Sequence, residues 1–175
     1  MDEPLADNSF IPMLALSEFI KDYVTVCLSG DGGDELFLGY ETYIADIIHK
    51  YASVLPLRHV SPLLSKILPA SYNKVSTEFK LKRFIAGCSF SVQRAHSSWR
   101  NMMYDDDINA LTGHKADNYN DIFDDHIQGF YQNVEDAHIL DQCSYVDMKT
   151  WLPDDILVKS DKSFTKSDKL FYIFN

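Results

Sequence analysis

The stretch VTVCLSGDGGDELFLGY, residues 24–40, decides the fold of this chain. Its first five residues are β-branched or apolar, which predicts a short buried strand over 24–28. Glycines then cluster at 30, 32 and 33, where they let the backbone turn sharply and approach a ligand closely. Asp34 is placed to cap a helix that follows. We expect a strand, a glycine loop and a helix, and ligands of open α/β sheets bind at such loops.

Helical patterns surround this unit on both sides. Downstream of the loop, one helix is expected from Asp34 onwards, because apolar residues recur every three or four positions, at Tyr40, Tyr43, Ile44, Ile47, Ile48 and Tyr51. Upstream, a helix over 9–22 is expected to place Leu16, Phe19, Ile20 and Tyr23 on one face. Further helices are expected over 61–68, 77–87, 91–103, 105–112, 118–132 and 135–150. A lone strand cannot form a sheet, so the partners of 24–28 are expected in another chain or in sequence outside this one.

Composition limits the class of protein. The 175 residues suit about one domain, and 46% hydrophobic with 24% charged residues is typical of a globular protein. A net charge of −10 repels phosphate backbones, so no nucleic-acid partner is expected. No apolar run approaches the ~20 residues of a membrane span, and no membrane partner is expected. Basic side chains gather over 51–100, where they either bind an anion or another chain, or neutralise acidic neighbours.

The cysteines and histidines give no metal-binding spacing. Three widely separated cysteines form neither a disulfide framework nor a zinc motif, which favours a reduced, cytoplasmic compartment. The six histidines are scattered and include no HExxH. The acidic run at 105–109 lacks the glycine and glutamate that a calcium loop needs at positions six and twelve. We therefore predict no zinc or calcium site from spacing alone.

The glycine loop carries an unusual charge. Asp31, Asp34 and Glu35 place three carboxylates within five residues, which would repel phosphate unless a cation lies between them. A Mg²⁺ ion held by one or two carboxylates and by phosphate oxygens would resolve that repulsion. The loop fits neither GxGxxG nor the Walker pattern. A simple glycine turn capped by Asp34 explains the same residues equally well.

Three motifs in order resemble one family. Residues 26–40 closely resemble the LSGDGGDELFGGY segment of glutamine-dependent asparagine synthetases. Residues 2–9, DEPLADNS, resemble the DEPFADSS stretch just upstream of it in that family. Residues 152–162, LPDDILVKSDK, resemble its YLPDDILVKVDR segment. Residues 80–84 and 94–99 also resemble segments of the family and follow one another in the same order. The resemblance covers about 1–163 and leaves 164–175 as a divergent tail.

This resemblance implies a fold and an activity. The fold would be the α/β adenine-nucleotide α-hydrolase-like type, that of PP-loop ATP pyrophosphatases, incomplete here and mostly helical with one clear strand of the parallel type. Synthetase domains of the family adenylate the side-chain carboxylate of aspartate with ATP and Mg²⁺ and release pyrophosphate. Ammonia derived from glutamine then displaces AMP. The small-molecule partners would be aspartate, ammonia and ATP.

The resemblance also implies roles for individual residues. Asp31 takes the place of a carboxylate that handles the ammonia proton, where many relatives carry glutamate. Asp34 matches a Mg²⁺ ligand, and Lys162 matches a basic group that meets the phosphates during adenylation. Substrate- and nucleotide-binding roles fall on Ser29, Gly30, Gly32 and, as a second basic candidate, Lys159.

The chain also departs from the family pattern. The Met-Cys start and the SGGxDS pyrophosphate loop are not found, and residues after 163 do not match. We expect the N-terminal half, with the glutaminase domain and that loop, to be supplied in trans or lost, and the isolated chain to be inactive. Two alternatives stay open: a non-catalytic truncated remnant or split-subunit interaction module, and a related adenylating amide or lactam synthetase.

Overall fold

A computed structural model describes residues 7–52, 77–100, 110–111, 113, 126–165 and 170–173. Two compact units divide the chain: unit 1 comprises 1–39 and 146–175, and unit 2 comprises 40–145. The helix expected over 61–68, most of 105–112 and the first part of 118–132 lie outside the described residues. None of the described helices is both long and apolar enough to cross a bilayer.

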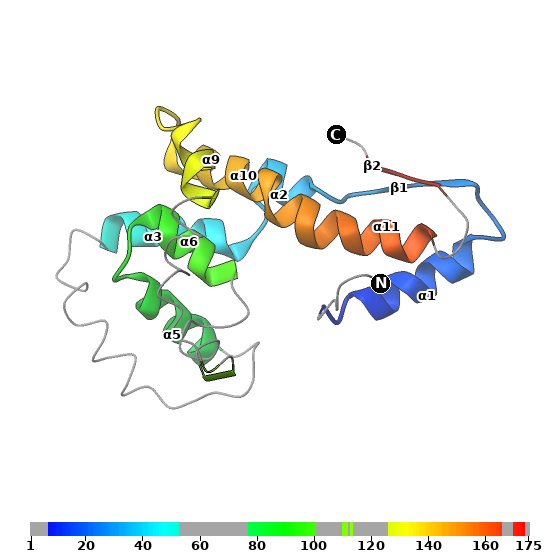
Figure 1. Cartoon of the computed structure of the whole chain (residues 1–175), viewed down its shortest axis with the longest axis horizontal. Coiled ribbons are helices and arrows are strands. Elements are labelled where there is room, and N and C mark those ends of the chain that lie inside the picture. Colours follow the sequence, from blue (N-terminus) through cyan, green and yellow to red (C-terminus); the bar gives the residue numbers. More distant parts are fainter. Residues whose placement is uncertain are drawn as a thin grey trace. The chain divides into compact units, whose positions relative to one another are not determined.

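Unit 1 contains two helices that pack side by side (Figure 1). They are α1 (Phe10–Ile20) and α11 (Val158–Thr165). The fully buried Ser17 hydroxyl of α1 donates a hydrogen bond of 2.9 Å to the Ser163 carbonyl of α11. The helix expected over 9–22 is confirmed as α1, and within it Leu16 and Phe19 are more than half exposed while Ser17 is buried. A small polar residue lets the two helices approach closely.

The strand expected over 24–28 is present as β1 (Val26–Ser29), but the expectation that it is buried is wrong, because Val26 and Leu28 are 46% and 59% exposed. It pairs in parallel with β2 (Leu170–Ile173), with Val26 opposite Leu170 and Ser29 opposite Ile173 (Figure 1). The expectation that all partners of this strand lie outside the chain is therefore wrong for one edge. Parallel pairing joins segments far apart in sequence, so no local pattern near β1 could reveal its partner.

The single helix expected from Asp34 to Tyr51 is two helices. The first, α2 (Gly33–Phe37), ends at Leu38, which has a left-handed φ of 59°. The Gly39 amide closes this end by donating a 2.8 Å hydrogen bond to the Asp34 carbonyl, and a β-carbon at Gly39 would collide with the Asp34 carboxylate. Gly32, not Asp34, is the N-cap of α2. The second helix, α3 (Glu41–Ala52), belongs to unit 2.

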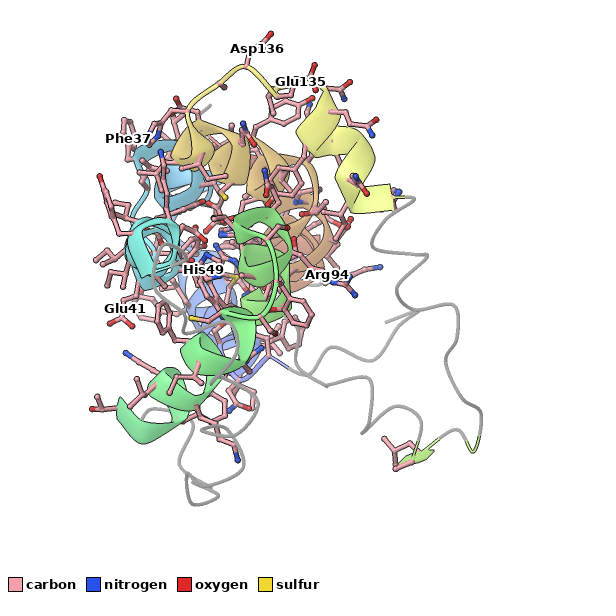
Figure 2. The ribbon with its side chains drawn as sticks, turned by 90° about the vertical axis from the view of Figure 1, so that its left-hand side faces the viewer. Phe37, Glu41, His49, Arg94, Glu135 and Asp136 are labelled. Atoms are coloured by element: carbon pink, nitrogen blue, oxygen red, sulfur yellow. The ribbon has the colours of Figure 1, made fainter. Side chains whose placement is uncertain are left out.

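Unit 2 packs α3 against α6 (Val92–Arg100), which in turn packs against α5 (Thr77–Gly87). Two further helices follow, α9 (Gln128–Gln132) and α10 (Ile139–Lys149), of which residues 139–145 belong to unit 2 and residues 146–149 to unit 1. The buried side of α3 carries Tyr43, Asp46 and His49. Of the apolar side chains that recur along this segment, Tyr43 is buried, whereas Ile44 and Tyr51 are 60% and 72% exposed. In Figure 2, His49 points inward from α3, and Glu41 points away.

An aromatic contact joins α5 to α6. The Trp99 ring stacks on Phe84 at 5.7 Å between centroids, and its indole nitrogen donates a 3.0 Å hydrogen bond to the Arg83 carbonyl. His49 meets the edge of the same indole, and its Nε2 lies 3.2 Å from the Gly87 carbonyl oxygen. The last residue of α5 is therefore held tightly against this cluster.

Substituting Gly87→Ala should destabilise the chain by about 1–3 kcal/mol, because a β-carbon there would lie 2.8 Å from Cε2 of Trp99 and overpack the interior. The matched control is Gly129→Ala in α9, where a β-carbon meets nothing within 4 Å and alanine favours the helix by up to about 1 kcal/mol. Chemical denaturation of both variants measures the difference, and equal midpoints would contradict this packing.

Candidate functional site

The glycine loop after β1 is shaped by short hydrogen bonds of its own. The Asp31 amide donates to the Ser29 hydroxyl at 3.2 Å, and the Gly33 amide donates to the Gly30 carbonyl at 3.0 Å. Gly32 has a left-handed φ of 87°, which side chains rarely adopt. A β-carbon at Gly30 or Gly33 would meet nothing within 4 Å, so the backbone of the loop is open there.

The loop meets the segment that begins at Leu152. A β-carbon on Gly32 would lie 3.4 Å from Cδ2 of Leu152, an ordinary van der Waals distance, so Gly32 and Leu152 are close neighbours. Leu152 opens the π-helix η2 (Leu152–Leu157), which runs directly into α11. Such π-helical segments are rare and often occur at functional sites. Two of the motifs singled out in the sequence are therefore in contact.

A hydrogen bond of 2.6 Å ties the same two motifs together through side chains. The Ser160 hydroxyl on α11 donates it to Oδ2 of Asp31 across 129 positions of sequence. Ser160 is fully buried, and its hydroxyl oxygen also lies 3.5 Å from the sulfur of Met13. Ser160 stands where the family segment quoted above has valine, so this chain adds a donor to the carboxylate that the sequence singled out.

Lys159 binds two carboxylates in unit 1. Its ammonium forms an ion pair with Asp7, which lies within the motif of residues 2–9, and is 3.5 Å from Oδ2 of Asp155. The Lys159 side chain is only 9% exposed, and that of Asp7 is 30% exposed. Burial opposes the charge of Lys159, but the hydrogen bond to Asp7 and the nearby carboxylates outweigh it, so its pKa is raised. Burial opposes the charge of the Asp7 carboxylate, but the hydrogen bonds from Lys159 and Ser9 and the charge of Lys159 together outweigh it, so the pKa of the Asp7 carboxyl is lowered.

The other two charged candidates are more accessible. Asp34 lies in the first turn of α2 with an exposed side chain that rests against Gly39. Lys162 is half-buried in the last turn of α11. The structure therefore brings Asp31 and Gly32 against the motif of residues 152–162. It also places Lys159 against Asp7. Sequence reasoning missed Ser160 and Asp7, and the only signal for Ser160 was its departure from valine in the quoted segment.

The loop suits a magnesium ion better than a transition metal. Asp34 offers an exposed carboxylate, and Asp31 offers a second one whose Oδ2 accepts the bond from Ser160. Among the described residues, these side chains belong to no group of three or more that could hold a metal by themselves. Mg²⁺ commonly takes only one or two carboxylates and completes its shell with water and phosphate oxygens, which fits this loop.

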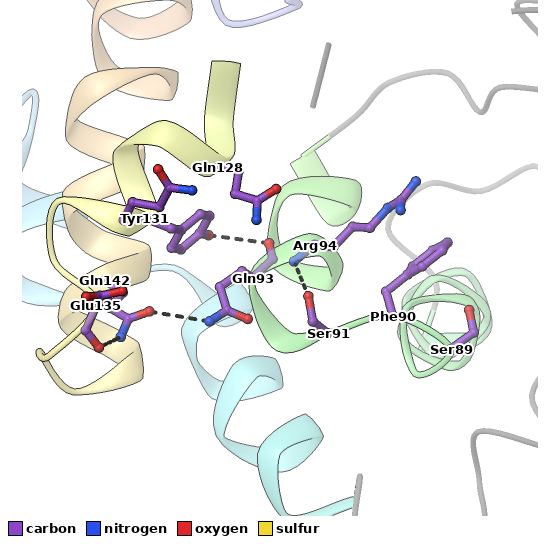
Figure 3. A pocket seen from close by; sticks show the side chains of 10 residues that line it. Ser89, Phe90, Ser91, Gln93, Arg94, Gln128, Tyr131, Glu135 and Gln142 are labelled. Carbon is purple, nitrogen blue, oxygen red and sulfur yellow. Dashed lines mark hydrogen bonds between the residues drawn. The ribbon is translucent and has the colours of Figure 1, made fainter. Parts of the chain in front are cut away.

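Unit 2 contains a separate pocket of about 530 Å³ (Figure 3). Polar side chains dominate its lining, and Gln142 is held there by bonds to the Glu135 and Ala137 carbonyls, of 3.0 and 2.9 Å. Tyr131 donates a bond of 3.4 Å to the Gln93 carbonyl at the same pocket. None of the residues that the sequence singled out for catalysis or binding lines it.

A strand, a glycine loop at its carboxyl end and a parallel partner strand are features of open α/β domains, in which ligands bind outside the carboxyl ends of the strands. Residues 1–166 match the family described as asparagine synthase, and the chain belongs to that family. The family implies the PP-loop adenine-nucleotide hydrolase-like fold, with which this mostly helical chain is consistent. No solved structure matches the chain.

Curated relatives carry the same family name. The chain is 28% identical to asparagine synthetase [glutamine-hydrolyzing] 1 of Bacillus subtilis, over 92% of this chain and 24% of the relative. It is also 28% identical to a putative asparagine synthetase of Mycobacterium bovis, over 93% of this chain and 24% of that relative. A putative relative from Methanocaldococcus jannaschii is 54% identical over 43 residues, 25% of this chain and 8% of the relative. The chain thus spans about a quarter of the length of the first two.

Replacing Lys159 by methionine should lower the free energy of unfolding by about 2 kcal/mol, because it leaves the Asp7 and Asp155 carboxylates partly buried without a cation. Lys159→Met is compared with Lys21→Ala, an exposed lysine of unit 1 that should change stability by less than about 0.5 kcal/mol. Equal effects of the two substitutions would contradict a structural role for Lys159.

The same ion pair predicts a pH dependence. The lowered pKa of Asp7 means that its contribution is present at neutral pH and is lost as the pH falls below its ordinary value of 3.8. The raised pKa of Lys159 means that its contribution is lost only above 10.5. The stability gap between the unmodified chain and Lys159→Met should therefore be constant from about pH 5 to 9 and shrink below pH 4. A gap that persists at pH 2.5 would count against the pair.

Proposed function

We propose that this chain supplies the loop that binds acid substrate and metal in an ATP-dependent ligase of the asparagine synthetase type. The observation that carries the proposal is the contact between the glycine loop and the η2–α11 segment, made by the Ser160–Asp31 hydrogen bond and by Leu152 against Gly32. Family membership and the names of the relatives support the same reaction class.

The proposed reaction has two steps. The side-chain carboxylate of aspartate attacks the α-phosphorus of ATP, and pyrophosphate leaves. Ammonia then attacks the acyl carbon of the adenylate, loses a proton, and AMP leaves with the electrons of the broken acyl–oxygen bond. A base positioned to take that proton typically contributes about 10²–10⁴-fold to such a step.

Asp31 is our candidate for that base. Ser160 binds its Oδ2, which fixes the orientation of the whole carboxylate and so of Oδ1. The open backbone at Gly30 would let the adenylate approach the loop, with Ser29 beside it. An aspartate reaches one methylene less than glutamate, so its position must be set by such a contact rather than by side-chain length.

Asp34 would hold Mg²⁺, which when bound would neutralise charge on the phosphates. Lys162 would meet those phosphates from α11. For Lys159 we propose a positioning role instead, because its ammonium already pairs with Asp7 and Asp155 in a nearly buried setting. It would join the segment at Asp7 to the end of η2, so that the loop and α11 keep their register.

Unit 1 exposes apolar side chains that would form a contact surface for other segments of such an enzyme. On α1, Ile11, Leu16 and Phe19 are 72%, 54% and 66% exposed, and on β1, Val26 and Leu28 are 46% and 59% exposed. Exposed apolar side chains gathered on one helix and one strand are typical of contact surfaces. We propose that the glutaminase domain and a pyrophosphate-binding loop, as one or more further segments, cover them.

A chimera tests this function directly. Residues 1–166 replace the matching segment of the Bacillus subtilis relative, and pyrophosphate release is measured with ATP, aspartate and ammonia. We expect aspartate-dependent release that Asp34→Asn lowers by at least tenfold, while Asp22→Asn, an exposed aspartate of the same unit, leaves it unchanged. Glutamine hydrolysis by the same chimera reports that the rest of the enzyme is folded.

Three outcomes separate the alternatives. A folded chimera whose pyrophosphate release equals that of its Asp34→Asn variant would favour the non-catalytic remnant. Release that depends on another carboxylic acid, but not on aspartate, would favour a related amide or lactam synthetase. The isolated chain should release no more pyrophosphate than its Lys162→Ala variant, and clear release by the isolated chain would contradict the need for further segments.

A further inference from the structure

Three buried side chains with metal-binding atoms converge in unit 2. Asp46 comes from α3, His96 from α6 and Cys143 from α10, and each of the three residues is 0% exposed. Nδ1 of His96 lies 2.7 Å from Oδ2 of Asp46. One possible ligand atom from each residue lies within 4.8 Å of the other two. This is the only such group among the described residues, and it belongs to unit 2, whereas the glycine loop belongs to unit 1.

The packing around the cluster holds its members in place. The His96 ring stacks on Tyr43 with 5.6 Å between centroids and an angle of 22°. The Tyr131 hydroxyl donates to the sulfur of Cys143 at 3.9 Å. The second carboxylate oxygen of Asp46, Oδ1, is buried and has no hydrogen-bond partner within the described part of the chain. A buried carboxylate oxygen without a partner is costly, so this atom points to a bound group.

We propose that Asp46, His96 and Cys143 bind a zinc ion that ties α3, α6 and α10 together. A thiolate, an imidazole and a carboxylate form a donor set that suits Zn²⁺, whereas Mg²⁺ and Ca²⁺ prefer oxygen alone. Ligand atoms of a tetrahedral zinc ion lie about 3.3–3.8 Å apart, a spacing that small side-chain adjustments can reach here. One carboxylate and one thiolate also balance the charge of the ion in this buried place.

The pocket of unit 2 would be the route by which an ion enters, because Tyr131 lines that pocket (Figure 3) and its hydroxyl also lies 3.9 Å from the sulfur of Cys143. A water molecule or the Tyr131 oxygen would complete the four ligands that zinc takes. The ion would act on the stability of unit 2, independently of the Mg²⁺ proposed for the loop of unit 1.

The competing structure is a hydrogen-bonded Asp–His–Cys chain with a protonated thiol. Burial raises the pKa of the Cys143 thiol, although His96 opposes this, so without a metal the sulfur keeps its proton at neutral pH. Zinc would displace that proton into solvent and bind the thiolate. The two structures therefore differ in metal content, in proton release and in the absorption of a cobalt-substituted sample.

The test uses the full chain, purified with zinc and then freed of excess metal by gel filtration. We expect about one zinc per chain by mass spectrometry, and a cobalt-substituted sample should show thiolate-to-cobalt absorption. Cys143→Ser should lower bound zinc at least fivefold and abolish that absorption. The matched control is Cys88→Ser, because Cys88 is also buried in unit 2 and burial likewise raises its thiol pKa.

A second pair of variants does not involve sulfur. His96→Asn should lower bound zinc at least fivefold, while His49→Asn, a buried histidine of α3 that contacts the Gly87 carbonyl, should retain it. Zinc should also raise the melting temperature of the unmodified chain and of both controls, but not of the Cys143 and His96 variants.

Two results would overturn the proposal. One is an unmodified chain with less than a tenth of a zinc ion per molecule after loading, whether it is folded or stays unfolded with zinc present. The other is zinc content that is equal in Cys143→Ser, His96→Asn and their controls, which would mean adventitious binding elsewhere. In either case the cluster is a hydrogen-bonded network alone.

Discussion

The hydrogen bond from Ser160 to Asp31 is the contact on which the rest of the proposed site depends. It joins the glycine loop after β1 to α11 across 129 positions of sequence, and the donor is fully buried. A hydrogen bond to a charged group contributes about 1.5–3 kcal/mol, more than most neutral ones. Without it, the short aspartate side chain would lose the contact that sets its direction, and the loop would lose its side-chain hydrogen bond to the motif of residues 152–162, leaving the Leu152–Gly32 contact.

The interior of unit 1 around this bond is unusually polar. Three residues of α11 make these polar contacts. The Ser163 carbonyl accepts a hydrogen bond from Ser17, and the Ser160 hydroxyl donates one to Asp31. Lys159 forms ion pairs with Asp7 and Asp155. Buried polar groups are costly when they lose their partners, so a shift of α11 would break several contacts at once. The helix is thereby held in one position relative to α1 and the loop. Apolar packing, by contrast, is sparse here, and much apolar surface on α1 and β1 is exposed.

The sequence predicted the local elements of this site better than their partners. The strand, the loop and the family were predicted from 24–40, because β-branched residues, glycines and carboxylates act locally. The break at Leu38 was missed, because a leucine with positive φ is rare and depends on Gly39 lying against Asp34. The apolar recurrence along α3 does not indicate its buried face, since its isoleucines are exposed while Asp46 and His49 are buried.

Contacts between distant segments were beyond local patterns for the same physical reason. Nothing near Val26 indicates Leu170, and nothing near Asp31 indicates Ser160, because each pairing forms only when the chain has folded. Sequence spacing likewise gives no signal that Asp46, His96 and Cys143 come together, because they lie on three separate helices. The roles that the resemblance implies for Ser29, Gly30, Gly32, Asp34 and Lys162 stay predictions.

A double-mutant cycle on Asp31 and Ser160 tests the central claim most directly. The free energy of unfolding is measured for the unmodified chain, Asp31→Ala, Ser160→Ala and the double variant. If the loop and α11 are joined by this bond, the double variant should lose about 1–2 kcal/mol less than the sum of the single losses. Losses that add within about 0.3 kcal/mol would show that the two side chains do not interact and would contradict the account.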